Sequence, residues 1–96
     1  MSAEKNNSDK IQAILDYLTV EFTESFIEHK YISSRSANVI FLSLKSYQTQ
    51  ISISNDFLEA NNPYNIKAKL IDFMVANFIR KKKPTHIILT NSGIKN

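Results

Sequence analysis

The pattern of hydrophobic and polar positions is clearest between residues 37 and 54. Residues 37–44 form an almost unbroken apolar run that is hydrophobic on both faces, and residues 49–54 alternate strictly between apolar and polar. Such patterns predict two strands joined by a short loop. A strand that is apolar on both faces is normally an interior strand, so the first of the two is predicted to lie in the middle of the sheet.

A helical pattern precedes the strands. Apolar residues recur at three- and four-residue steps at Ile11, Ile14, Leu15, Leu18, Phe22 and Phe26. They predict a helix with Ser8 as N-cap that runs to about His29 or Tyr31. A second apolar stripe on this helix consists of Tyr17, Val20, Ile27 and Tyr31. A helix on a sheet needs only one apolar stripe, so the second is a candidate protein interface, with scattered exposed apolar residues as the alternative.

The second half of the chain is predicted to contain one short helical turn, one long helix and one strand. Asp56 and Glu59 have the spacing of a capping box. Asn62 and Pro63 then begin a helix that continues to Lys83. Residues 85–90 read as a third strand, and residues 1–7 and 91–96 as flexible ends.

These elements predict a single α+β domain over residues 1–96, in the order α-β-β-α-β. Connection rules favour a two-layer sandwich, with a three-stranded antiparallel sheet of order 2-1-3 and both helices on one face. The other face would then expose Ile40, Leu42 and Leu44 or the alternate residues of the same strand, because the pattern leaves open which side the helices cover. Because an apolar sheet face needs cover, the chain is expected to form a homodimer.

Composition excludes several classes of site. The chain has no cysteine, so it has no disulfide and no thiolate ligand or nucleophile, and its single glycine, Gly93, excludes a glycine-rich phosphate loop. The N-terminus is polar, and no apolar run is long enough to span a bilayer. The expectation is a cytoplasmic protein without membrane contact.

The net charge is +3, and most basic residues follow residue 32. The basic residues proposed to contact nucleic acid are Lys67, Lys69, Arg80, Lys81, Lys82 and Lys83. The alternative is that cations at a helix C-terminus only complement the helix dipole. An exposed Tyr47 at the hairpin tip would add a stacking surface for a base.

The titratable residues do not form a catalytic motif. His29 and His86 are isolated, and Glu21, Glu24 and Glu28 read as a solvated helix face. Residues 33–36, which include Arg35, are serine-rich and read as a loop, with phosphate binding as the alternative. No enzyme activity, cofactor or metal is expected.

Two functional hypotheses follow. The first is a small non-enzymatic interaction or regulatory module, a homodimer that binds a protein partner through the sheet face or the first helix. The second is a nucleic-acid-binding accessory protein that uses the basic residues above.

Overall fold

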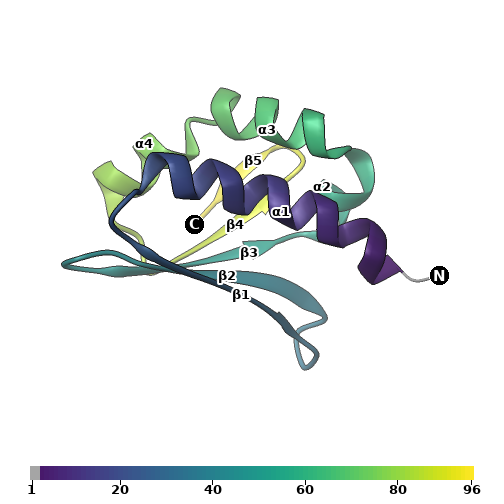
Figure 1. The fold of residues 1–96 in the computed structure, drawn as a ribbon, viewed down its shortest axis with the longest axis horizontal. Coiled ribbons are helices and arrows are strands. Elements are labelled where there is room, and N and C mark those ends of the chain that lie inside the picture. Colours follow the sequence, from purple (N-terminus) through teal and green to yellow (C-terminus); the bar gives the residue numbers. More distant parts are fainter. Residues whose placement is uncertain (1–2) are drawn as a thin grey trace.

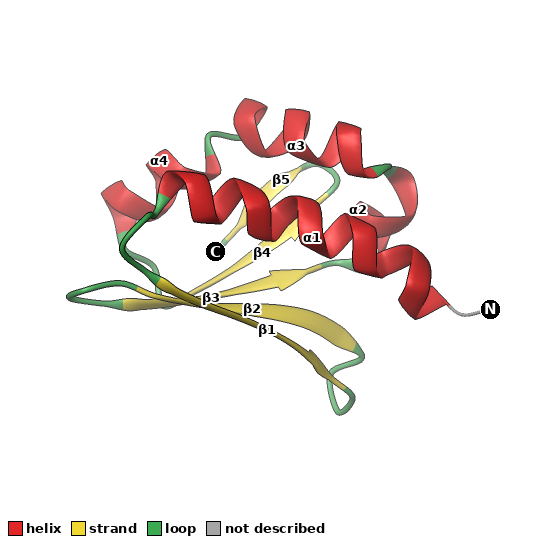
Figure 2. Cartoon of the chain, in the orientation of Figure 1, coloured by secondary structure: helices red, strands yellow, loops and turns green. Residues whose placement is uncertain are grey.

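A computed structural model describes residues 3–96, with side chains from Asn7 on. The elements along the chain are α1 (Ala3–Glu21), β1 (Phe26–Ile32), β2 (Ala37–Ser43), β3 (Gln48–Ile53), α2 (Asn55–Ala60), α3 (Pro63–Asp72), α4 (Val75–Lys82), β4 (His86–Thr90) and β5 (Gly93–Lys95). The sheet order is β1-β2-β3-β4-β5, antiparallel throughout except for the parallel pair β3–β4. The four helices lie on one side of the sheet (Figure 1), and the opposite side is left open (Figure 2).

The α+β class agrees with the prediction, but the predicted sheet is wrong in detail. The sheet has five strands and is mixed, where three antiparallel strands were expected, and the order α-β-β-α-β omits β1, β5 and the division of the helices. The predicted third strand, β4, pairs in parallel with β3 and not with β2, so the order 2-1-3 is wrong. The doubly apolar β2 is interior, as predicted, because β1 covers its other edge.

Strand β1 occupies the segment that was predicted as the end of the first helix. The helix ends at Glu21, and the Ser25 hydroxyl donates to the Phe22 carbonyl at 2.6 Å in the turn that follows. From Phe26 the chain pairs with β2 over seven residues. Aromatic and β-branched residues are frequent here and suit a strand, so the four-residue spacing of Phe22 and Phe26 was misleading.

The ends of the chain also differ from the prediction. Helix α1 is already formed at Ala3, so Ser8 lies inside it and is not its N-cap. Residues 1 and 2 of the segment expected to be flexible, 1–7, lie outside the described residues. At the other end, β5 pairs with β4 within the segment 91–96 that was expected to be a loose tail.

The predicted long helix is divided at Met74, which adopts a left-handed conformation with φ of 55° and ψ of 47°. The break changes the helical phase, so that Ile66 and Leu70 of α3 and Val75 and Ile79 of α4 are all buried. An unbroken helix cannot direct an apolar arc this wide at one sheet.

The core lies between the helices and the sheet. On the helix side it contains the expected stripe of α1, and on the sheet side it contains Ile40, Leu42, Ile51, Ile53, Ile87 and Leu89. Ile40 and Leu42 have no exposed surface, so they are core residues and not part of an open apolar face. The helices therefore cover the face of β2 that was predicted to be open.

Candidate interaction surface: the open face of the sheet

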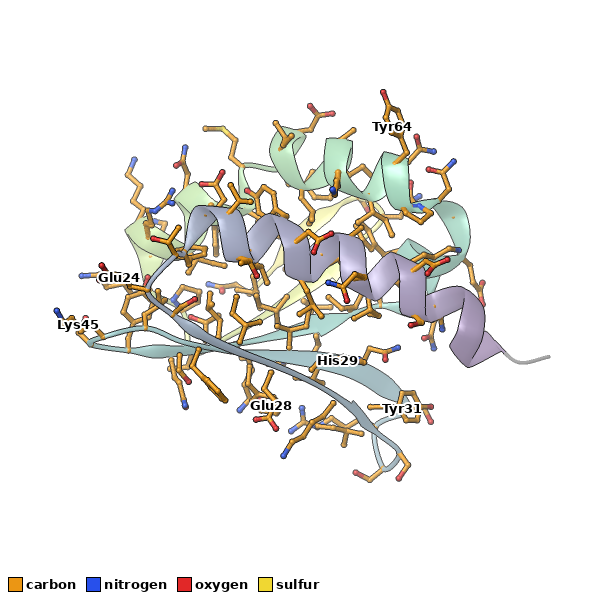
Figure 3. All side chains as sticks on the ribbon, viewed as in Figure 1. Glu24, Glu28, His29, Tyr31, Lys45 and Tyr64 are labelled. Atoms are coloured by element: carbon orange, nitrogen blue, oxygen red, sulfur yellow. The ribbon has the colours of Figure 1, made fainter. Side chains whose placement is uncertain are left out.

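Strand alternation defines the residues of the open face. Because Ile40, Leu42 and Ile51 point into the helix-covered core, their neighbours along each strand point to the opposite side. The open face of the three central strands therefore consists of Ala37, Val39, Phe41, Ser43, Gln48, Gln50, Ser52, His86, Ile88 and Thr90. Among these, Val39 has no exposed surface, because its neighbours on the same face cover it. The register places Val39 beside Ser52 and Phe41 beside Gln50. Figure 3 shows Glu28 of β1 projecting on this side, away from the helices.

The centre of the open face carries no Asp, Glu, Lys or Arg. Charged side chains occur only on the outer strands, namely Glu28 and Lys30 of β1 and Lys95 of β5. Phe41 is half-buried, and the Lys30 ammonium lies 5.9 Å from the centre of its ring. Phe26 at the β1 end is 67% exposed. An uncharged, partly apolar centre with charges at its rim is the composition of a protein interface.

A serine and a histidine meet on this face. Ser52 Oγ lies 2.8 Å from His86 Nε2, across the parallel strands β3 and β4. Nucleophilic catalysis would also need a group that orients the imidazole and donors that stabilise an oxyanion. Among the described side chains, those of residues 7–96, none forms a hydrogen bond with the other nitrogen of His86. The pair adds two hydrogen-bonded polar side chains to the centre of the open face.

The second stripe predicted on the first helix is not one surface. Val20 is 73% exposed on α1, whereas Tyr31 is 57% exposed on β1. Ile27 and Leu44 are partly buried against the core. Tyr17 is also packed there, and its hydroxyl accepts the Ala76 N–H at 3.0 Å at the start of α4. Burial raises the pKa of Tyr17, and Glu21 raises it further, while the bond from Ala76 and the Arg80 charge lower it.

The predicted basic cluster is partly engaged within the molecule. Arg80 Nη2 donates to the carbonyl of Glu21 at 2.7 Å and to its carboxylate at 3.0 Å, and its guanidinium lies 4.9 Å from the centre of the Phe22 ring. Arg80 therefore links α4 to the end of α1. Lys83 Nζ lies 5.9 Å from the centre of the Tyr47 ring.

The remaining predicted cations lie on two helices. Lys67 and Lys69 belong to α3, and Lys69 Nζ lies 5.7 Å from the centre of the Phe73 ring. Lys81 and Lys82 are exposed at the end of α4. The structure thus divides the predicted six-residue surface between α3 and the end of α4, where Arg80 binds Glu21 and Lys81 and Lys82 are exposed.

Two hollows lie outside the open face. One, of about 550 Å³, lies where α3 meets α4 and is lined by Phe73, Met74, Asn77, Phe78, Arg80, Lys81 and Lys82. The other, of about 610 Å³, lies between α1, α2 and the first two strands. It contains His29, which was expected at a helix end but lies on β1, where its Nε2 is 2.9 Å from Asn38 Oδ1. The groove was not predicted from the sequence, because part of its lining comes from β1, which was predicted to be the end of a helix.

The other candidate residues are dispersed. Glu21 ends α1, Glu24 lies in the connection, and Glu28 is on β1, so they do not form one helix face. Residues 33–36 form the exposed β1–β2 turn. The described residues contain no group of three or more His, Cys, Asp or Glu placed to hold a metal ion. No helix within residues 3–96 is both long and apolar enough to cross a membrane.

The comparisons with known proteins add no assignment. No family model, no curated protein and no solved structure matches this chain.

Proposed function

We propose that the protein is a non-enzymatic interaction module that binds a protein partner across the open face of the sheet. The observation that carries the proposal is the composition of that face: its three central strands present apolar and polar side chains without Asp, Glu, Lys or Arg, which occur only on the outer strands. Interfaces are depleted in charged residues at their centre and polar at their rim.

The size of the open face favours a transient contact over a permanent one. Five strands spaced about 4.8 Å apart, each roughly five residues long, cover an area on the order of 400 Å². That area, counted on both partners, falls at the low end for specific complexes, where transient signalling contacts occur. A regulatory role is consistent with this size.

Site-specific photo-cross-linking tests the proposal. A photoreactive phenylalanine analogue replaces Gln50, at the centre of the open face, or Tyr64, which is 83% exposed on α3 on the helix side. In cells that express the chain, position 50 is expected to yield a discrete cross-linked protein, and Phe41→Asp in the same chain should abolish it. Equal cross-linking from both positions, or none from position 50, would remove the open face as the binding site.

Nucleic acid binding is the second candidate, and one observation favours it. The hollow between α3 and α4 places Phe73 and Phe78 beside Lys81 and Lys82. Aromatic rings beside cations suit single-stranded nucleic acid, whose bases stack while its phosphates pair with lysine. If this candidate is correct, a fluorescent oligonucleotide binds at low salt, and Lys81→Glu with Lys82→Glu removes the binding. Salt-independent binding, or none at low salt, contradicts it.

A further inference from the structure

Strand β1 is an edge strand with one unpaired side. It is first in the sheet order and pairs with β2 over all seven of its residues, Phe26–Ile32. Its outer edge therefore carries free backbone amides and carbonyls, which can pair with another strand. Five of its seven residues are exposed. Figure 1 draws β1 at the front, and no described element lies in front of it. The other edge strand, β5, has only three residues.

The sequence of β1 is complementary to itself when two copies run antiparallel. With His29 opposite His29 of a second copy, the register pairs Phe26 with Ile32, Ile27 with Tyr31, and Glu28 with Lys30. Aromatic–aliphatic pairs and opposite charges are the cross-strand pairs that stabilise a sheet. Every pair away from the centre is therefore favourable.

The neighbouring registers are unfavourable. In a two-fold antiparallel pair the central residue faces its own copy, so moving the centre by one residue sets Glu28 against Glu28 or Lys30 against Lys30. Like charges directly opposite each other destabilise a sheet. The charges of β1 thus select the register centred on His29.

Charged residues on an edge strand normally prevent edge-to-edge pairing. Here the two charges have opposite signs and flank His29 symmetrically, with Lys30 Nζ 3.8 Å from Glu28 Oε2 within one chain. A two-fold rotation brings each charge opposite its counterpart. The same arrangement of charges therefore permits β1 to pair with β1 of a second copy and disfavours its pairing with other strands.

We infer that two copies pair through β1, antiparallel and centred on His29, to form one continuous sheet with all helices on the same side. The pairing uses the edge of the sheet and not its open face, so it is independent of the partner proposed above. It also places the two open faces side by side as one larger surface.

Charge exchange tests this inference by sedimentation of the purified chain over a range of concentrations. The chain is expected to sediment at twice its 11.0 kDa mass. Glu28→Lys and Lys30→Glu should each weaken the dimer about tenfold or more, because both symmetry-related pairs become repulsive. Both side chains are about half exposed, so folding is unaffected and circular dichroism checks it.

Two further measurements decide the register. The chain that carries both substitutions, and an equimolar mixture of the two single variants, should each recover the dimer, because every pair is again of opposite charge. Glu24→Lys, outside β1, is the charge-matched control and should leave the dimer intact. A monomeric chain, single variants that dimerise like the unaltered chain, or no recovery in the mixture would overturn the inference.

Discussion

At the scale of the residue, Ser54 performs two tasks at the start of α2. It is the N-cap residue, and its hydroxyl oxygen accepts the Phe57 N–H at 3.3 Å. The same hydroxyl donates to the carboxylate of Asp56. The capping-box interpretation of Asp56 and Glu59 located a helical turn here correctly, but it assigned the cap two residues too late.

Replacing this cap should destabilise the protein. Ser54→Ala leaves the first amides of α2 without their partner, so the free energy of unfolding is expected to fall by about 1 kcal/mol. Urea denaturation measures the change, and Ser46→Ala in the exposed β2–β3 turn is the matched control, expected to have little effect. Equal losses in both variants would contradict the capping role.

The same substitution should change a titration. The hydrogen bond from Ser54 is the main cause that lowers the pKa of Asp56, and backbone amides, including that of Phe57, lower it further. A carboxylate whose pKa is lower in the folded state stabilises the fold at pH values above its unfolded pKa. This contribution is lost as the pH falls through the folded pKa. Carbon NMR of the Asp56 carboxyl group should show the pKa rise toward its ordinary value in Ser54→Ala.

At the scale of the element, the sequence was a good guide wherever one face of an element alone meets the core. The apolar stripe of α1, the strands β2, β3 and β4, and the cap of α3 follow from local pattern. Asn62 indeed accepts the Asn65 N–H at 2.7 Å, with Pro63 in the first turn. Local pattern determines these elements because each directs a regularly spaced apolar face toward the helix-covered core, although in β2 Val39 on the other face is buried as well.

Strand β1 and the break at Met74 could not be predicted in the same way. Most of β1 is exposed, so its alternation of apolar and polar residues carries little signal, and Phe26 continues a helical spacing by coincidence. Met74 has no glycine or proline beside it. Packing imposes the break. The buried positions are five residues apart between Leu70 and Val75, whereas a continuous helix returns to the same face after three or four residues. For a related reason the sequence left open which side of β2 the helices cover: both of its faces are apolar.

The break at Met74 can be tested by glycine substitution. A left-handed backbone is strained for every residue that carries a side chain, and glycine avoids this strain. In Met74→Gly the relief of strain exceeds the cost of the greater freedom that glycine gives to the unfolded chain. We expect the free energy of unfolding to rise by about 0.5 kcal/mol. Ile71→Gly, at a similarly exposed position inside α3, should lower it by about 1 kcal/mol. A loss of stability in both variants would show that the break does not form as described.

At the scale of the whole molecule, the two sides of the sheet have different tasks. Within the described residues, the helix side forms the core that joins all five strands to the helices. The open side is the proposed partner site. The two sides of β2 alternate one residue at a time, so neighbouring positions should respond to substitution in opposite ways.

Leu42 and Phe41 make this contrast measurable. Leu42 has no exposed surface and faces the helices, so Leu42→Asp buries an unpaired carboxylate within the core. Truncation of such a leucine to alanine already costs about 2–5 kcal/mol, against a total stability of about 5–15 kcal/mol for a domain. Leu42→Asp is therefore expected to unfold the chain, whereas Phe41→Asp, on the open side, should retain the native circular dichroism spectrum and a cooperative thermal transition. A folded Leu42→Asp chain would mean that the helices cover the other side of the sheet. In that case the open face, and with it the proposed partner site, would have to be assigned to Ile40, Leu42 and their neighbours.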